Sequence, residues 1–191
     1  GNGATGGQLT INAGNVDVSG DAALGDPFSP IVLNGGSVSQ LATTESPSTR
    51  NLTLGSPIAN TVDVASGATW TFDGVISGAT GAQGLTKTGA GELDPTNTSH
   101  RFIGAGGWSV DIKGGVVGIS DDRDINGAYV NTGGIYANEV LLDGGALKYL
   151  ASGTYLTPLE VDNGAAGVIV GPGVTATVGT AVATSTAGRI I

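Results

Sequence analysis

Hydrophobic residues along this chain alternate with polar residues in short bursts. Residues two apart are apolar at Leu9 and Ile11, Val16 and Val18, Ile31 and Leu33, Val62 and Val64, Val110 and Ile112, Val117 and Ile119, Leu147 and Tyr149, and Val168 and Val170. A period of two predicts strands with one buried face. Clusters of Gly, Asn, Asp or Ser end the bursts, and no stretch keeps the spacing of an amphipathic helix. The pattern therefore predicts a protein made almost entirely of strands and turns.

The pattern also repeats over a long distance. Three blocks match others about a hundred residues later: Leu9–Ser19 with Val110–Ser120, Ile31–Ala42 with Val140–Ala151, and Val62–Phe72 with Val168–Val178. The matches pair Gly14 with Gly115, Gly35 with Gly144, Gly36 with Gly145 and Gly67 with Gly173, and we expect these eight glycines to form tight corners. We predict one domain over 1–191, made of two related units at about 8–93 and 108–191, with an irregular segment 94–107 between them.

Two folds are compatible with this pattern. Apolar bursts recur every 20 to 30 residues or so, a spacing typical of stacked solenoid repeats. The segments Asn34-Gly35-Gly36 and Asp143-Gly144-Gly145 are also strong hairpin signals, which would give an antiparallel β-sandwich. Aromatic residues make up only 5% of the chain. This scarcity favours a narrow coil filled by smaller side chains, so we predict a parallel β-helix, with the β-sandwich as the alternative.

One stretch is similar to a known repeat. GATWTFDGVISG (Gly67–Gly78), followed by GLTKTGAGEL (Gly84–Leu93), resembles the autotransporter-associated β-strand repeat of bacterial autotransporter passenger regions. The upstream LTINAGNVDVSGDAALGD and PIVLNGGSVSQL look like the preceding part of that repeat. The resemblance implies a right-handed parallel β-helix that is exposed on or released from the cell surface, and it implies no catalytic activity. The chain departs from the repeat after Gly91, where ELDPTNTSHRF contains Pro95 and charged residues.

Composition narrows the class of protein. Gly accounts for 35 of 191 residues, 12% of residues are charged, and the formal net charge is −9. This excludes a helix-rich core and argues against nucleic acid as a partner, because nucleic-acid binding needs basic groups. Cys and Met are absent, which suits an oxidising exterior. No apolar run is long enough for a membrane helix, and the start GNGATGG without Met suggests a processed product or a piece of a longer chain.

Few residues offer catalytic chemistry. His100 is the single His, and its surroundings, NTSHRF, predict a solvated loop. Without Cys or a second His, the chain has neither a thiol nucleophile nor a multi-histidine metal site. No phosphate-binding glycine motif opens a helix. We therefore expect no enzyme activity and no cofactor.

Carboxylates and aromatic residues are the remaining candidates. Asp121, Asp122 and Asp124 could hold Ca²⁺ through oxygen ligands, although a solvated loop beside Arg123 is the simpler reading. Six further Asp residues each stand alone in turns or at strand edges, where we expect them to serve turn formation and solubility: Asp63, Asp73, Asp94, Asp111, Asp143 and Asp162. Five aromatic residues could stack on sugar rings if they shared a face: Trp70, Trp108, Tyr129, Tyr136 and Tyr155. We expect Trp70 to be partly buried.

A stack of strands suggests a mechanical function. The end turns of such a rod have open strand edges that template pairing with other chains. Leu9 and Ile11 near one end, and Ile190 and Ile191 at the other, are candidate self-association residues. Our leading hypothesis is a non-catalytic extracellular structural protein of the bacterial surface, a stalk or filament subunit that supports adhesion or a biofilm matrix. Its partners would be further copies, or the rest of a longer passenger. The alternative is a carbohydrate-active or glycan-binding β-helix, whose partner would be a surface glycan.

Overall fold

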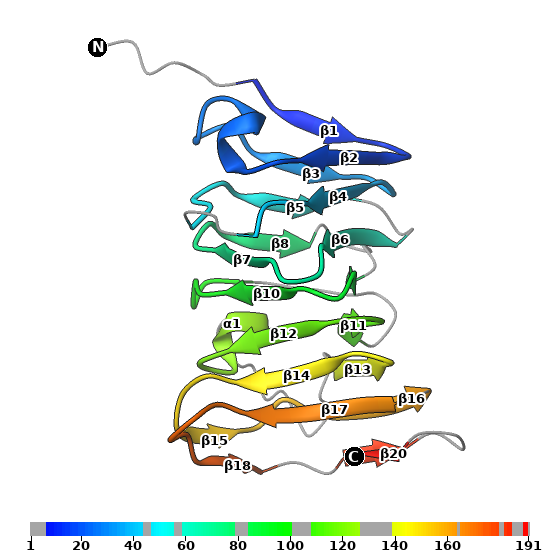
Figure 1. Cartoon of the computed structure of the whole chain (residues 1–191), viewed down its shortest axis with the longest axis vertical. Coiled ribbons are helices and arrows are strands. Elements are labelled where there is room, and N and C mark those ends of the chain that lie inside the picture. Colours follow the sequence, from blue (N-terminus) through cyan, green and yellow to red (C-terminus); the bar gives the residue numbers. More distant parts are fainter. Residues whose placement is uncertain are drawn as a thin grey trace.

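Successive turns of this chain lie on top of one another and pair in the parallel sense (Figure 1). The computed structural model describes residues 7–43, 47–55, 59–78, 84–100, 108–126, 139–163, 165–179, 182–184 and 189–190. Every strand pairing within these ranges is parallel. Leu9 pairs with Ile31, Ile31 with Leu52, and Leu52 with Ile76, so the chain returns to one position every 21 to 24 residues. The predicted parallel β-helix is confirmed, and the β-sandwich alternative is wrong.

The longest sheet contains eight strands and runs the length of the stack. In chain order its strands are β2 (Asn15–Val18), β4 (Ser37–Gln40), β6 (Asn60–Val64), β9 (Leu85–Thr88), β11 (Trp108–Ile112), β13 (Glu139–Asp143), β16 (Leu159–Asn163) and β19 (Val182–Thr184). Neighbouring strands of a sheet lie about 4.8 Å apart, so seven steps give a stack roughly 34 Å long.

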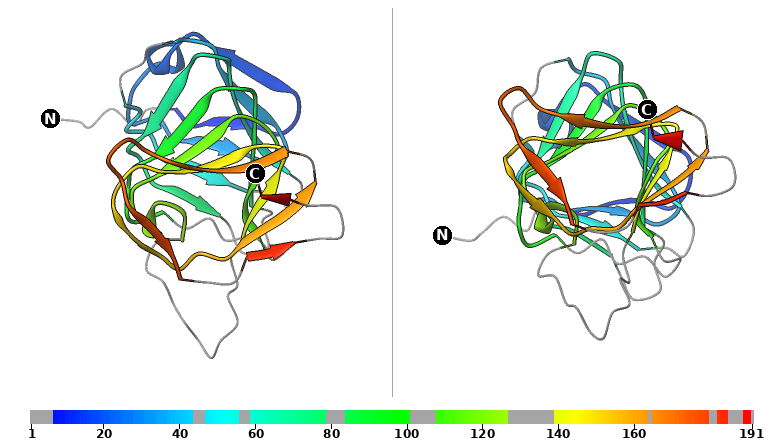
Figure 2. Two further views of the ribbon diagram at one scale, coloured as in Figure 1. Left: turned by 60° about the horizontal axis from the view of Figure 1, so that its bottom comes forward. Right: turned by 90° about the horizontal axis from the view of Figure 1, so that it is seen from below.

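Two more faces complete each turn and enclose the core (Figure 2). A six-stranded sheet contains β7 (Thr69–Phe72), β10 (Glu92–Pro95), β12 (Val116–Ile119), β14 (Ala146–Tyr149), β17 (Ala165–Val170) and β20 (Arg189–Ile190). The third face contains β1 (Leu9–Ile11), β3 (Ile31–Leu33), β5 (Leu52–Leu54) and β8 (Ile76–Gly78), and further along the stack β15 (Gly153–Tyr155) and β18 (Ala176–Val178). Each strand of the third face is followed in the chain by a strand of the eight-stranded sheet, so these six strands occupy equivalent places in the coil.

Two short helices take the place of strands. The 3₁₀ helix η1 (Asp21–Leu24) follows β2, and α1 (Arg123–Asn126) follows β12. Leu24 packs against the core from a partly buried position, and Ile125 is fully buried. Each helix therefore contributes an apolar side chain to the core, as the strands of other turns do.

The Gly-rich segments that resembled hairpins are corners between sheets. β3 and β4 flank Asn34-Gly35-Gly36, yet β3 pairs with β1 and β5 while β4 pairs with β2 and β6. Six of the eight predicted corner glycines have a positive φ: Gly14, Gly35, Gly67, Gly115, Gly144 and Gly173. The other two, Gly36 and Gly145, lie against the previous turn, where a Cβ would fall 2.3 and 2.4 Å from an Ile side chain. The local sequence thus predicts the tight bend. Pairing with the strands of adjacent turns determines which sheet the strand after the bend joins.

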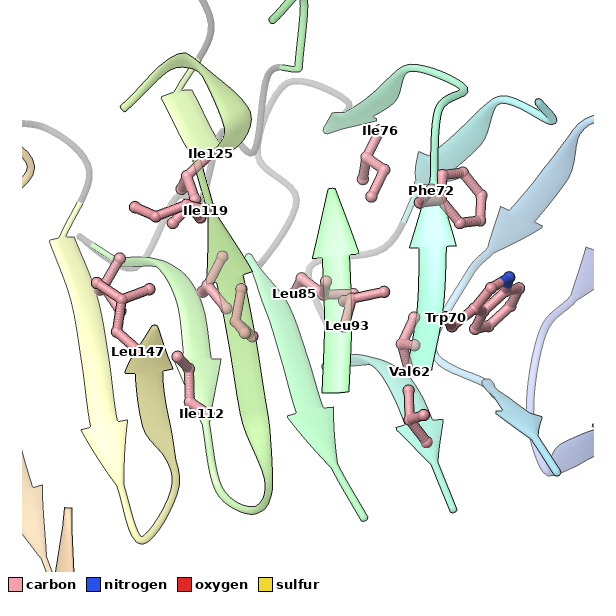
Figure 3. Packing of buried hydrophobic residues seen from close by; sticks show 14 of the residues in the cluster. Val62, Trp70, Phe72, Ile76, Leu85, Leu93, Ile112, Ile119, Ile125 and Leu147 are labelled. Atoms are coloured by element: carbon pink, nitrogen blue, oxygen red, sulfur yellow. The ribbon is translucent and has the colours of Figure 1, made fainter. Parts of the chain in front are cut away.

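The core is a set of side-chain ladders that run along the stack (Figure 3). One ladder on the eight-stranded sheet consists of Val16, Val38, Val62, Lys87, Ile112, Leu142 and Val161 in continuous register. Full burial of one such aliphatic side chain is worth about 1.5 to 3 kcal/mol. The apolar members of this ladder stabilise the stack, and Lys87 interrupts it with an ammonium group.

The two matched halves of the sequence occupy different faces of the coil. Leu9–Ser19 passes from the third face to the eight-stranded sheet, whereas Val110–Ser120 passes from the eight-stranded to the six-stranded sheet. The other two matched pairs of blocks are displaced by one face in the same direction. The sheets also continue across the predicted junction, since β10 pairs with β12 and β9 with β11. The division into two units remains a sequence interpretation, and its matched strands are not equivalent in the coil.

Strand β10 extends further than the sequence suggested. Asp94 and Pro95, placed at the start of the irregular segment 94–107, pair with Thr71 and Phe72 of β7. Pro95 has no N–H to donate, and the register with β12 on the other side covers only Glu92 and Leu93. The proline therefore ends one ladder without ending the strand.

Replacing a corner glycine should be costly in proportion to how closely the turns approach. Gly115 has a φ of 65°, and a Cβ there would lie 2.2 Å from the Gly91 carbonyl oxygen. Gly173 has a φ of 72° but no atom within 4 Å of its Cβ position. We expect Gly173→Ala to lower the free energy of unfolding by about 1 to 2 kcal/mol through backbone strain alone, and Gly115→Ala to lower it by more. Urea unfolding of both variants measures this, and equal losses would show that inter-turn contact at Gly115 is unimportant.

Candidate functional site

The proposed calcium ligands are engaged by protein donors. Both Nε and Nη2 of Arg123 donate to Asp121, at 2.9 and 2.8 Å, and these bonds hold the pKa of Asp121 below its usual value. Asp122 accepts from the Thr157 hydroxyl at 2.8 Å and from the Thr157 N–H at 3.2 Å. It therefore ties the loop after β12 to the segment that follows β15.

Asp124 is the most deeply buried of the three carboxylates. Its Oδ2 accepts from the N–H groups of Ser120 and Asp121, at 2.6 and 2.9 Å, and burial raises its pKa. Across the part of the chain that the structure describes, no three His, Cys, Asp or Glu side chains are grouped to hold a metal ion. The arrangement of Asp121, Asp122 and Asp124 shows a network that organises the start of α1.

Several carboxylates that stand alone in sequence have close neighbours in the coil. Lys113 Nζ lies 3.1 Å from Asp111 Oδ2 and 2.6 Å from Asp143 Oδ2, and joins consecutive turns. Burial raises the pKa of Asp111, and the charges of Asp143 and Asp162 raise it further while Lys113 opposes them. The stacking of turns of 20 to 30 residues brings these groups together. A search for local sequence motifs does not find such contacts, because the residues are far apart in the chain.

Asp63 and Asp73 also accept hydrogen bonds from the next turn. Thr88 Oγ1 donates to Asp63 Oδ1 at 2.7 Å, and Thr96 Oγ1 donates to Asp73. Asp94 lies near Glu92, on the outer surface of the six-stranded sheet. These contacts connect adjacent turns or neighbouring positions on one sheet face.

Aromatic side chains are mostly inside the coil. Trp70 is completely buried, contrary to the expected partial burial, and its ring packs edge-on against Phe72 with centroids 5.5 Å apart (Figure 3). Tyr155 is also buried and packs against Tyr149. Trp70 and Tyr155 are therefore unavailable to stack on a sugar. Tyr129, Tyr136 and the side chain of Trp108 lie outside the described residues.

His100 is buried, which corrects the prediction of a solvated loop residue. The Ile76 N–H donates to His100 Nδ1 at 2.9 Å. Burial lowers the pKa of the imidazole to about 4. A neutral ring that accepts a hydrogen bond from β8 helps to join the turn after β10 to the preceding turn, a role that NTSHRF alone does not indicate.

Arg50 holds the first turns together from inside the coil. Its guanidinium donates to the Asp21 carboxylate at 2.8 Å and to four backbone carbonyl oxygens, of Asp21, Gly25, Asp26 and Ser29. These contacts use all five N–H donors of an arginine that is 1% exposed. The segment that follows η1 is therefore fixed by a fully satisfied buried cation, for which the sequence shows no recognisable signal.

Lys87 is a second buried cation that binds backbone carbonyl oxygens, at a corner near the middle of the stack. Its stem lies in the apolar ladder, and its Nζ donates to the carbonyl oxygens of Thr88, Gly89 and Gly114. Burial lowers its pKa to about 8, with Asp63 opposing the shift. The ammonium group thus bridges two consecutive corners.

The structure describes only some of the side chains that we predicted to mediate self-association at the two ends. Leu9 is half-buried, Ile11 is buried, the side chain of Ile190 is not described, and Ile191 lies outside the described residues. Elsewhere, the exposed large hydrophobic side chains of the described chain gather near the two ends of the stack: Phe28 and Leu41, and Leu156, Ile169, Val170 and Val178. Val170 and Val178 are paired with buried Tyr149 and Tyr155, so both point toward the core at the end of the stack.

The described part of the chain has no helix long and apolar enough to cross a membrane.

The buried Lys87 should make stability rise in alkaline solution. The pKa of Lys87 is about 8 in the folded state and about 10.4 in an unfolded chain, so the unfolded chain binds more protons between these values. The free energy of unfolding should therefore increase as pH rises from 8 to 10. Urea unfolding across this range should show the increase, and Lys87→Met should remove most of it. An equal increase in the variant would assign the effect to other groups.

Comparison with known proteins gives one informative match. The chain is 37% identical over 98 residues to the adhesin BmaC autotransporter of Brucella suis biovar 1 (strain 1330). The match covers 51% of this chain and 3% of that protein, so the chain spans a small part of the relative's length. No protein-family model matches the chain, and no solved structure matches it. The match and the parallel β-helix together fit an autotransporter passenger.

Proposed function

We propose that this chain is a non-catalytic, rod-like part of a bacterial surface adhesin that acts as a stalk. The observation that carries the proposal is the uninterrupted parallel ladder from β2 to β19, which makes the segment a rod with backbone hydrogen bonds directed along its length. The similarity to an autotransporter adhesin supports a location outside the cell. The stretch Gly67–Leu93 is, on this proposal, a copy of the autotransporter-associated β-strand repeat.

The internal chemistry supports a mechanical role. Arg50, Lys87 and His100 all serve contacts between turns, and the candidate ligands Asp121, Asp122 and Asp124 bind backbone and side-chain donors of the chain itself. These groups make contacts that join consecutive turns or organise the loop before α1, which supports a structural role for them. In an adhesin, such a rod would hold a binding region away from the cell and contribute to adhesion or to a biofilm matrix.

Adherence of cells that carry the natural protein tests the stalk role. Removing residues 1–191 in frame should lower adherence, and inserting an unrelated β-helical segment of equal length should restore it, because a stalk contributes length and stiffness. Surface exposure is checked by protease digestion of intact cells. Unchanged adherence after the deletion, or no recovery with the unrelated rod, would contradict the stalk role.

We also propose that copies of the chain associate end to end. Among the described residues, β1 pairs only with β3, and β18 only with β15, so each has an unpaired edge. The β18 strand reads Ala-Thr-Val and has no charged residue to block pairing; its Val178 is 37% exposed, and Val170 of β17 is 48% exposed. These features favour a head-to-tail contact, which repeats without closing and gives a filament.

Two complementary variants test this contact. Leu9→Lys and Val178→Lys each place a charge at one end, so each variant alone should sediment as a monomer. An equimolar mixture retains one intact pair of ends and should form a dimer and nothing larger, whereas the wild type should form longer assemblies. Far-UV circular dichroism checks that both variants fold. A monomeric wild type, or a mixture without dimers, would rule out head-to-tail association.

A further inference from the structure

Three side chains meet on the outer surface of the six-stranded sheet, where Asp94 lies near Glu92. Glu92 and Asp94 project from β10, and Lys148 projects from β14, two strands away. The intervening residues Leu93 and Leu147 are buried, which places the three polar side chains on the opposite face. We call Glu92, Asp94 and Lys148 the carboxyl latch.

Lys148 reaches across a whole strand to bind Glu92. Its Nζ lies 2.6 Å from Oε1 and 2.9 Å from Oε2 of Glu92, so the ammonium engages both carboxylate oxygens. The side chains are only 26% and 19% exposed. This contact links β10 directly to β14 and spans β12, in addition to the backbone ladders that join each strand to its neighbour.

Gly118 of β12 makes room for this contact. Gly118 is paired with Lys148, and a Cβ on it would lie 2.2 Å from Asp94 Oδ1 and 3.0 Å from Glu92 Oε1. The carboxyl groups of the latch therefore lie over the glycine. Any side chain on this residue would have to displace the Asp94 carboxyl.

Within the carboxyl latch, the ionised form of Asp94 is the unfavourable one. Burial, then the charge of Glu92 and a hydrogen bond with it, together raise the pKa of Asp94 to about 7, against the opposing effects of Lys148 and the Gly118 N–H. Its paired neighbour on β7 is the uncharged Thr71, and Ile169 of β17 lies next to Lys148 in register. Glu92 and Lys148 are thus the charged groups that face Asp94 on this surface.

We propose that the carboxyl latch is a proton-operated contact between turns. With a proton on Asp94, this side chain donates to Glu92, and Glu92 keeps a full carboxylate for Lys148. Release of the proton to solvent leaves two adjacent carboxylates competing for one ammonium over Gly118. The contact between β10 and β14 then weakens, so the middle of the rod is held more tightly in mildly acidic surroundings than in alkaline ones. This inference does not rest on the proposed stalk function.

Hydrogen exchange of β10, β12 and β14 amides tests the latch in the full chain. With Asp94 titrating at about 7 when closed and about 4 when open, local opening should increase by up to roughly thirtyfold between pH 5.5 and 8.5, after correction for intrinsic exchange rates. The ¹³C resonance of the Asp94 carboxyl should titrate near pH 7. In Asp94→Asn, which retains a hydrogen-bond donor, the opening should become nearly independent of pH.

A second variant and a control separate the latch from general effects. Gly118 lacks the positive φ that disfavours other residues, so Gly118→Ala should fold while displacing the Asp94 carboxyl and reducing the pH response. Asp17→Asn, on an exposed position of another face, should leave the response unchanged. Titration of Asp94 near pH 4, or the same pH response in Asp94→Asn as in the wild type, would overturn the proposal.

Discussion

Successive turns of this protein must approach one another closely at their corners, and the rest of the structure depends on that approach. The Gly145 N–H donates to the Ile112 carbonyl oxygen of the previous turn at 3.0 Å, and the Gly91 N–H donates to the Val64 carbonyl oxygen at 2.9 Å. A Cβ on Gly91 would lie 2.3 Å from the Ala65 carbonyl oxygen. The backbone ladder can therefore continue around a bend only where the side chain is missing. Because the corners keep this spacing, the strands between them stay in register and the apolar side chains stack.

Bends in such a coil also expose carbonyl oxygens, and two buried cations bind them. Lys87 donates hydrogen bonds to three carbonyl oxygens at adjacent corners. Arg50 donates to four carbonyl oxygens of the segment around η1 and to the Asp21 carboxylate. An unpaired buried charge costs several kcal/mol, so each cation is tolerable only because its donors are satisfied. Both residues connect parts of the chain far apart in sequence. These hydrogen bonds explain why a chain with few charged residues buries two of its cations.

The sequence predicts the strands well because alternation has a direct physical cause, the burial of one strand face. Ile31 and Leu33, for example, are apolar in sequence and fully buried in β3. The choice between corner and hairpin at Asn34-Gly35-Gly36 was open locally, since both need the same tight bend. The match between Gly14 and Gly115 paired corners of different faces, because every corner of the coil has the same chemical requirement. The contact of Lys113 with Asp143 depends on which turns lie side by side, which only the register determines.

The buried titratable groups have opposing effects on the pH dependence of folding. His100 has a pKa of about 4 when folded, below that of a free imidazole, so its contribution to stability falls as pH drops from 6.5 to 4. Asp94 has a raised pKa of about 7, so its contribution falls as pH rises from about 4 to 7. Over the range that they share, the protons bound on folding by one group offset those released by the other. Burial also raises the pKa values of Asp111 and Asp124, so these two carboxyl groups act in the same direction as Asp94 and His100 offsets only part of their combined effect.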